Sequence, residues 1–426
     1  MKRLVLILLC IMLTGCQAIT FSVDGLLSAP KVADEQSAIY EALFESAGRG
    51  ITLEYPRSGD YRSAFVLYDI DGDREEETLA FYSVNSVSES NVKISVLDSG
   101  EDGRWRSTYE VAGAGSSVDK IMFSGRDLIV GYTSQDYEDN AVRIYRYSEG
   151  MLEPIYEDTY SVLEKADLDG CGTEETLVVK RSGGGIAVDL LKPSESEVYS
   201  HYFTEIPLGA GTIAGFGFSE FDGVNALYLD FALESYGILT EIIYLDGGIV
   251  AAMSQSGLLY QTQRPTGYLS RDYDGDGLIE IPLPQPFTGY ELSPFGEAEY
   301  MTVFCSFDPE QMLLVPKSNA YLSLGESYCF NIPNRWMNMV TVARDASTGE
   351  TTFYKYDPSL GGAENMTPLI SFASAESSAA SAYESAGYTK IAGTDFRTYY
   401  VKIIAGSDEP MVLTMDEIRD NFHIIE

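Results

Sequence analysis

Three short segments of this 426-residue sequence place carboxylates at the spacing of a cation-binding bend. Counted from its first aspartate, each segment has an acid at offsets 0, 2 and 8, and two of the segments also have one at offset 4. The acids are Asp69, Asp71, Asp73 and Glu77; then Asp167, Asp169 and Glu175; then Asp272, Asp274, Asp276 and Glu280. Ca²⁺ takes about six to eight oxygen ligands. These residues are therefore the candidate ligands of structural calcium, with an expected Kd of roughly 10⁻⁴–10⁻³ M.

The three segments differ in how well they suit Ca²⁺. The second has Cys171 at offset 4, and a thiol is a poor ligand for a hard cation, so we expect a weak or vacant site there. An EF-hand is excluded, because its closing Glu stands at offset 11, where this chain has Ala80, Val178 and Leu283. D-x-D-G is also a common hairpin sequence in which Asp forms Asx-turns. On that alternative reading the acids only shape the turn.

The D-x-D-x-D-G-x-x-D/E spacing resembles the calcium loops of FG-GAP repeats, the units of integrin-α-type and VCBS-type β-propellers. The third segment matches best, with Gly277 after its third aspartate. The first has Arg74 where that family usually has glycine. The resemblance implies a calcium-stabilised propeller with a role in adhesion or ligand binding.

The segments recur at a regular distance. Their first aspartates are 98 and 105 residues apart, about twice a period of 50, and apolar runs separated by Gly, Asp, Asn or Ser fill the intervals. Strand cores are expected near Leu79, Leu128, Leu177, Leu227, Ile281, Val340 and Tyr400. Repeated short strands of this kind are typical of a β-propeller. We therefore predict an all-β fold over residues 34–426, a β-propeller of about seven four-stranded blades with short capping helices.

Helical spacing of apolar residues is confined to a few places. Residues 34–47 place Tyr40, Leu43, Phe44 and Ala47 on one face, which predicts an N-terminal helix that caps the propeller. Residues 374–386 predict a short helix or an insertion, and residues 415–422 a closing helix.

The N-terminus predicts where the protein resides. Lys2 and Arg3 precede an apolar run over 4–13 that is too short to span a bilayer, which indicates a signal peptide over residues 1–15. The tetrapeptide over 13–16, LTGC, resembles the lipobox of bacterial lipoproteins, which implies that Cys16 is acylated, for example with palmitate. Residues 16–33 then form a tether, and the protein is a lipid-anchored membrane protein on the extracytoplasmic face, at the cell surface. The alternative is an ordinary secretory signal with an accidental cysteine.

Composition limits the possible partners and chemistry. The formal net charge of −37 excludes nucleic acid as a partner, because phosphate binding needs clustered cations. Only His201 and His423 are present, and no nucleophile-elbow, zinc-protease or phosphate-loop motif occurs, so no catalytic or organic cofactor-binding residue is predicted. Cys171, Cys305 and Cys329 are expected to be buried thiols, with a bond between Cys305 and Cys329 left open.

The functional prediction is a binding or scaffolding module, not an enzyme, whose ligand is a protein or glycan that the sequence does not identify. Two alternatives remain. One is a surface polysaccharide hydrolase that uses a carboxylate pair, which 65 acids make possible. The other is an envelope-assembly lipoprotein that would expose an apolar patch to a protein partner.

Overall fold

The computed structural model describes residues 34–425, apart from 85–91, 101, 135–138, 194–198, 222, 235–236, 295–296 and 377–379. The predicted signal peptide over 1–15, the tether over 16–33 and Cys16 lie outside the described residues. The chain divides into two compact units: unit 1 ends at Asp158 and unit 2 begins at Thr159.

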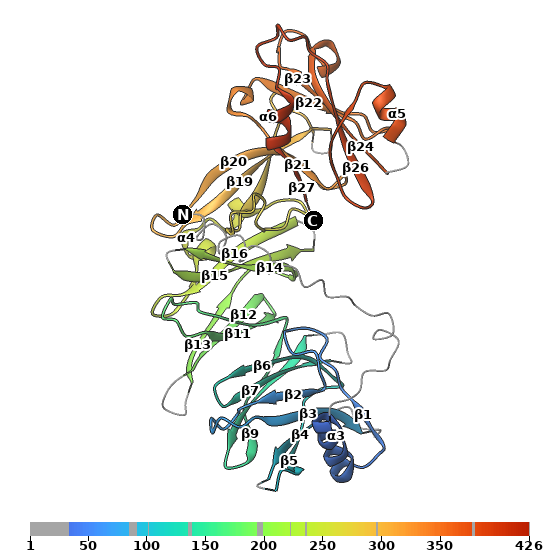
Figure 1. The fold of residues 1–426 in the computed structure, drawn as a ribbon. Coiled ribbons are helices and arrows are strands. Elements are labelled where there is room, and N and C mark those ends of the chain that lie inside the picture. The colour runs from blue at the N-terminus through green and yellow to red at the C-terminus, as the bar shows by residue number, and fades with distance from the viewer. Residues whose placement is uncertain are drawn as a thin grey trace, which may run out of the picture. The chain divides into compact units, whose positions relative to one another are not determined.

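The described residues form six antiparallel sheets that follow one another along the chain (Figure 1). Sheet 1 contains β1 (Ile51–Leu53), β2 (Phe65–Tyr68), β3 (Glu77–Val84), β4 (Val92–Ser99) and β5 (Trp105–Ala112). Sheet 2 contains β6 (Ser117–Ser124), β7 (Asp127–Thr133), β8 (Asn140–Ser148) and β9 (Met151–Tyr160). These two sheets belong to unit 1, whose boundary falls inside β9.

Sheets 3 to 6 belong to unit 2. Sheet 3 contains β10 (Val162–Ala166), β11 (Glu175–Ser182), β12 (Gly185–Lys192) and β13 (Ser200–Ile206). Sheet 4 contains β14 (Gly211–Phe221), β15 (Val224–Leu233), β16 (Gly237–Leu245) and β17 (Ile249–Ala251). Sheet 5 contains β18 (Ile281–Pro286), β19 (Tyr300–Asp308), β20 (Leu313–Ser323), β21 (Tyr328–Asn331) and β27 (Phe422–Ile424). Sheet 6 contains β22 (Val340–Arg344), β23 (Thr351–Lys355), β24 (Thr367–Glu376), β25 (Thr389–Gly393) and β26 (Arg397–Ile403).

Burial distinguishes the strands within a sheet. The inner strands β3 and β7 are buried at nearly every position, so both of their faces are covered. The outer strand β5 instead alternates between half-buried and exposed residues, as a strand with one solvated face does. Successive four- or five-stranded antiparallel meanders with this gradient are the blade organisation of a β-propeller. The predicted all-β propeller fold class is therefore confirmed at the level of its sheets.

We expected about seven blades, and the described residues form six sheets. The strand cores at Val340 and Tyr400, which the periodicity assigns to separate blades, both belong to sheet 6. The segment between them contains the short helix α5 (Ala380–Ser385) and the added strand β25. This insertion lengthens one sheet to nearly the spacing of a whole repeat, which explains the extra blade in the sequence-based count.

Neighbouring sheets share apolar cores within each unit. In unit 1, Phe81 and Ile94 of sheet 1 join Leu128 and Tyr132 of sheet 2 in one buried cluster. In unit 2 one cluster spans sheets 3 to 5, and a second, rich in aromatic rings, joins sheets 5 and 6. Burial of apolar side chains on both faces of the inner strands is the main driving force for folding of these sheets.

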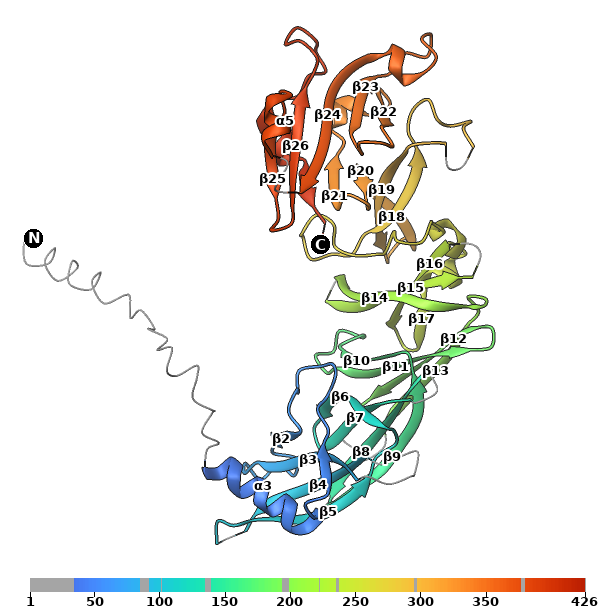
Figure 2. The same cartoon turned by 90° about the vertical axis from the view of Figure 1, so that its right-hand side faces the viewer.

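Helices α3, α5 and α6 lie in segments that were predicted to be helical, whereas α4 (Ala252–Ser256) was not predicted. Helix α3 spans Asp34–Ala47, as the apolar spacing indicated, and lies against sheet 1 (Figure 2). Its Ala42 and Leu43 join Tyr82 and Leu97 of sheet 1 in one buried cluster. The structure ends β24 at Glu376 and places α5 within the predicted segment 374–386, while α6 (Met415–Asp420) forms in the predicted closing segment. A capping box between Thr414 and Glu417 fixes the start of α6. Among the described residues, no helix is both long and apolar enough to cross a membrane.

Replacement of Leu43 tests whether α3 is part of unit 1. The side chain is fully buried, so Leu43→Ala should destabilise the protein by about 2–5 kcal/mol through lost burial and the cavity left behind. The measurement is the denaturant midpoint, with the exposed Glu45→Ala on the same helix as control. Equal midpoints for the two variants would show that α3 contributes nothing to the core.

Candidate metal centres

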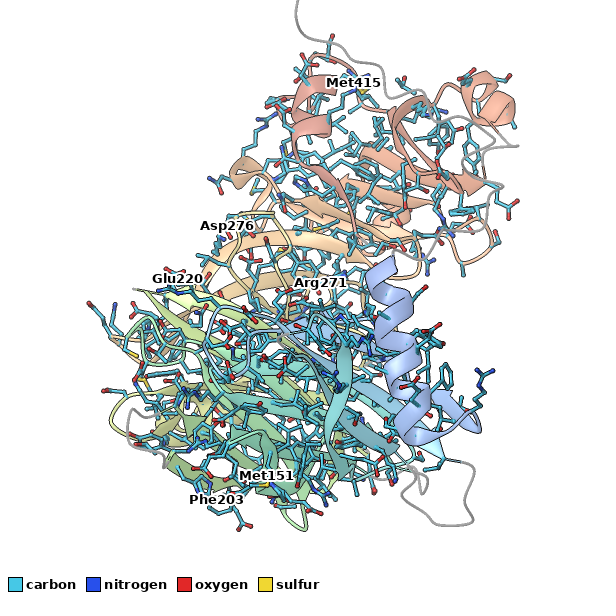
Figure 3. The ribbon with its side chains drawn as sticks, turned by 60° about the horizontal axis from the view of Figure 1, so that its bottom comes forward. Met151, Phe203, Glu220, Arg271, Asp276 and Met415 are labelled. Atoms are coloured by element: carbon cyan, nitrogen blue, oxygen red, sulfur yellow. The ribbon has the colours of Figure 1, made fainter. Side chains whose placement is uncertain are left out.

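The three acidic segments occupy equivalent places in alternate sheets. We name them loop 1 (residues 69–77), loop 2 (167–175) and loop 3 (272–280). In each, the residue before the first aspartate pairs with the closing glutamate: Tyr68 with Glu77, Ala166 with Glu175, and Arg271 with Glu280. Each loop leads directly into a strand: β3 and β11, which lie inside sheets 1 and 3, and β18, which is the first strand in the order of sheet 5. The three bends therefore share one pairing pattern, and Figure 3 labels Arg271 and Asp276 at loop 3.

The first aspartate organises each loop through the backbone. In loop 3, Asp272 accepts hydrogen bonds from the N–H groups of Gly275 (2.6 Å) and Gly277 (2.9 Å). In loop 1, Asp69 accepts the corresponding bonds from Gly72 (2.8 Å) and Arg74 (3.1 Å). The second aspartate accepts one N–H two residues further on, in all three loops. These Asx-type bonds account for the shape of the bend, as the hairpin alternative expected, and they leave further carboxylate lone pairs for a cation.

Two positions in each loop adopt the left-handed conformation. At offset 3 the residues are Gly72, Gly170 and Gly275, and at offset 5 they are Arg74, Gly172 and Gly277. Arg74 has φ +81°, close to the +85° and +88° of the two glycines at the same offset. Loop 1 therefore keeps the shared fold at the expense of backbone strain in a residue with a Cβ atom.

The closing glutamate is buried in every loop. The exposed fraction is 3% for Glu77, 0% for Glu175 and 1% for Glu280. Each accepts a backbone N–H from the residue after the first aspartate, at 3.1 Å from Ile70, 2.8 Å from Leu168 and 2.9 Å from Tyr273.

Burial raises the pKa of all three closing glutamates, because it penalises the charged form. The pKa of Glu77 rises to about 7; the N–H of Ile70 opposes the shift, while the charges of Asp71 and Asp98 add to it. The three buried carboxylates all need a compensating positive charge if they are to stay ionised at a low energetic cost.

Most predicted ligands come together. In loop 3, ligand atoms of Asp272, Asp274, Asp276 and Glu280 all lie within 4.8 Å of one another. In loop 1 the same holds for Asp69, Asp71 and Glu77, while Asp73 lies outside that group and accepts the N–H of Glu75 at 2.7 Å. In loop 2 the group is Asp167, Asp169 and Cys171, with Glu175 outside it.

Three charged residues beside the loops were not identified from the sequence. Asp98 follows Leu97, the partner of Thr78 on the strand beside β3, which places Asp98 next to Glu77. Lys192 follows Leu191, the partner of Thr176, and so takes the same place beside loop 2. Lys317 reaches loop 3 from β20. None of them stands at a fixed sequence distance from its loop, so only the strand register reveals them.

These neighbours give the three loops different electrostatics. Lys192 contacts the Asp169 carboxylate and lies 3.4 Å from Glu175 Oε1. Lys317 lies 3.1 Å from Asp274 Oδ2 and 2.8 Å from Glu280 Oε1. Across the described part of the chain, no lysine or arginine forms an ion pair with Asp69, Asp71, Asp73 or Glu77. Loop 1 is thus the strongest concentration of uncompensated negative charge among the three.

The described residues also include three free cysteines and a further buried carboxylate, Glu241. Cys305 and Cys329 are buried free thiols, whereas Cys171 is exposed, contrary to expectation, because it lies on the bend of loop 2.

Burial raises the pKa of Glu241, and a carboxyl group with a raised pKa is of the kind that a hydrolase would need. Its carboxylate instead accepts the N–H groups of Met253 (2.8 Å) and Ser254 (3.0 Å), which anchors helix α4 (Ala252–Ser256) to β16. Glu241 is therefore a structural residue.

Comparisons with known proteins show no family. No protein-family model matches the chain, and no curated protein matches it in sequence. Similar solved structures include Sqt1 from Chaetomium thermophilum (13% identity, TM-score 0.29, covering 69% of this chain and 72% of that one). They also include the periplasmic gluconolactonase PpgL from Pseudomonas aeruginosa (12%, 0.26, 69% and 95%) and a protein from Lactobacillus plantarum (10%, 0.27, 73% and 85%). At TM-scores this low, the similarities carry no argument about function.

The left-handed conformation of Arg74 predicts a stabilising substitution. Arg74→Gly should raise the free energy of unfolding by roughly 0.5–1 kcal/mol, because glycine relieves the steric cost of positive φ and only part of that gain is lost to its greater freedom in the unfolded chain. The measurement is denaturant unfolding at physiological salt. Arg74→Lys, which keeps both the strain and the charge, should match the parent protein. A loss of stability in Arg74→Gly would contradict the strain argument.

Proposed function

We propose that this protein is an extracytoplasmic, lipid-anchored binding or scaffolding module whose blade-like sheets are stabilised by Ca²⁺ at the acidic bends. The proposal rests on the uncompensated carboxylates of loop 1. Its buried Glu77, with Asp69 and Asp71, forms a compact group of carboxylates beside Asp98, and no ammonium or guanidinium group among the described residues pairs with the loop's acids. Such a group is costly unless a cation joins it.

The donor set of loop 1 suits calcium. All side-chain donors are carboxylate oxygens, which hard cations prefer, and no imidazole or thiol that would favour a transition metal is present in the loop. Asp69, Asp71 and Glu77 would hold the ion, and Asp73 and Asp98 would add negative charge close by. A bound ion would connect the bend to the first residue of β3. Its role would be structural, because it would hold two strands of sheet 1 in register.

Two further parts of the proposal rest on sequence resemblance. The spacing of the acids in the three loops supports an FG-GAP or VCBS-like repeat protein, for which adhesion or ligand binding is the expected role. The charged start, the apolar run and the LTGC tetrapeptide support a lipoprotein anchored through Cys16. The proposed partner is a protein or a glycan at the cell surface, and nucleic acid is disfavoured by the net charge of −37.

Calcium removal tests the metal proposal. At a free Ca²⁺ concentration ten times Kd, binding should add about 1.4 kcal/mol to stability and raise Tm on the order of 2–4 °C above the value in EDTA. Asp71→Asn should abolish that difference, because it removes a ligand from the carboxylate group. Glu75→Gln, an exposed acid of the same loop outside the ligand set, should retain it. Identical melting curves with Ca²⁺ and with EDTA would reject a calcium site.

A second prediction concerns the lipid anchor. In a bacterial host, Cys16→Ser should move the protein from the membrane fraction to the soluble fraction and prevent its labelling by radioactive palmitate. Cys171→Ser, which changes an exposed thiol on loop 2, should leave both unchanged. Membrane association of the Cys16→Ser variant would refute acylation as the anchor.

A further inference from the structure

We propose that Lys192 and Lys317 are built-in cations of loops 2 and 3, so that Ca²⁺ binding is confined to loop 1. The inference rests on the proposed calcium site, because it concerns which of three equivalent bends takes the ion. It runs against the acid spacing alone, by which loop 3 is the best calcium ligand set of the three.

A lysine of β20 lies against three of the four acids of loop 3. The Lys317 ammonium contacts Asp276 and lies 3.1 Å from Asp274 Oδ2 and 2.8 Å from Glu280 Oε1. Three of the four predicted ligands thus share one positive charge. A lysine ammonium carries its positive charge at neutral pH, as a surrogate for a metal ion must.

A β-bulge directs Lys317 toward loop 3. Phe304 pairs with Ser318 and Cys305 pairs with Pro316, so Lys317 is the extra residue between two consecutive pairs of the β19–β20 ladder. A bulge of this kind bends the strand and changes the direction of a side chain. Ile281, the residue after Glu280, pairs with the same Cys305, which brings the bulge next to the closing glutamate.

Loop 2 also has a lysine beside its acids, but this lysine comes from β12. The Lys192 ammonium contacts Asp169, lies 3.3 Å from Cys171 Sγ and 3.4 Å from Glu175 Oε1. Lys192 ends β12, whose Leu191 pairs with Thr176. Loop 2 also lacks a carboxylate at offset 4, so the lysine compensates a smaller group of acids.

Loop 1 carries an acid at the register position of Lys192. The pairing of Thr78 with Leu97 matches that of Thr176 with Leu191, and the next residue is Asp98 in one sheet and Lys192 in the other. A negative charge at this position increases the demand for a cation, while a positive charge satisfies it. A lysine ammonium supplies up to three hydrogen-bond donors and one positive charge. Because it is part of the protein, it neutralises the nearby carboxylates at any calcium concentration. Sheets 3 and 5 would therefore keep their bends when calcium is scarce.

The test is calcium stoichiometry and melting of the full chain, with Ca²⁺ as the only ligand. The parent protein should bind one Ca²⁺ per chain. Lys317→Met should lower Tm in EDTA by roughly 2–4 °C and bind a second Ca²⁺. Asp274→Asn in the Lys317→Met background should remove that second ion, whereas Asp274→Asn alone should leave one ion bound. Lys317→Arg, which keeps the charge, should also bind one.

Lys192→Met should lower Tm in EDTA, and Lys390→Met, at an exposed position of β25, is the control that should change neither quantity. A parent protein that binds two or three ions, one of them lost in Asp274→Asn, would overturn the proposal. So would a Lys317→Met variant with parental Tm and stoichiometry. If no variant binds Ca²⁺ but Lys192→Met and Lys317→Met still melt below the control, the calcium proposal fails and the built-in cations stand.

Discussion

The structure depends on one repeated constraint: a glutamate is buried at the point where an acidic bend enters a strand. Glu77, Glu175 and Glu280 each begin or directly precede such a strand and are almost fully buried. A single backbone N–H to each carboxylate does not offset the loss of water around a charge. The rest of each site can be understood as a way to supply the missing positive charge, either by an ion or by a lysine.

The position of these bends explains why that charge matters for the fold. Each bend pins the start of a strand whose first two residues are buried. A slip of one residue in such a strand would turn its apolar side chains to the wrong face. The pairing of the closing glutamate with the residue before the first aspartate, repeated in sheets 1, 3 and 5, therefore fixes register where errors would cost the most. A binding or scaffolding module needs this rigidity, because its surface loops depend on the sheets beneath them.

Much of the architecture could be predicted from the sequence because it is encoded locally. The apolar spacing over residues 34–47 predicted α3 correctly, and the offsets of Asp, Gly and Glu predicted three equivalent bends, since Asx-type bonds and positive-φ positions join residues only a few positions apart. The number of sheets was less predictable. Val340 and Tyr400 look like two repeats because the insertion of α5 and β25 moves the first and the last strand of one meander about one repeat apart.

The sequence by itself determined the all-β class, the position of the bends and the identity of their carboxylates, because each follows from short-range geometry. Only the tertiary structure decided which charge stands opposite each bend. Asp98, Lys192 and Lys317 reach their loops across strand pairs, through hairpins of different length and, for Lys317, through a bulge. Register across a sheet is set by the packing of whole strands and has no constant sequence separation. Three nearly identical motifs therefore have three different electrostatic environments.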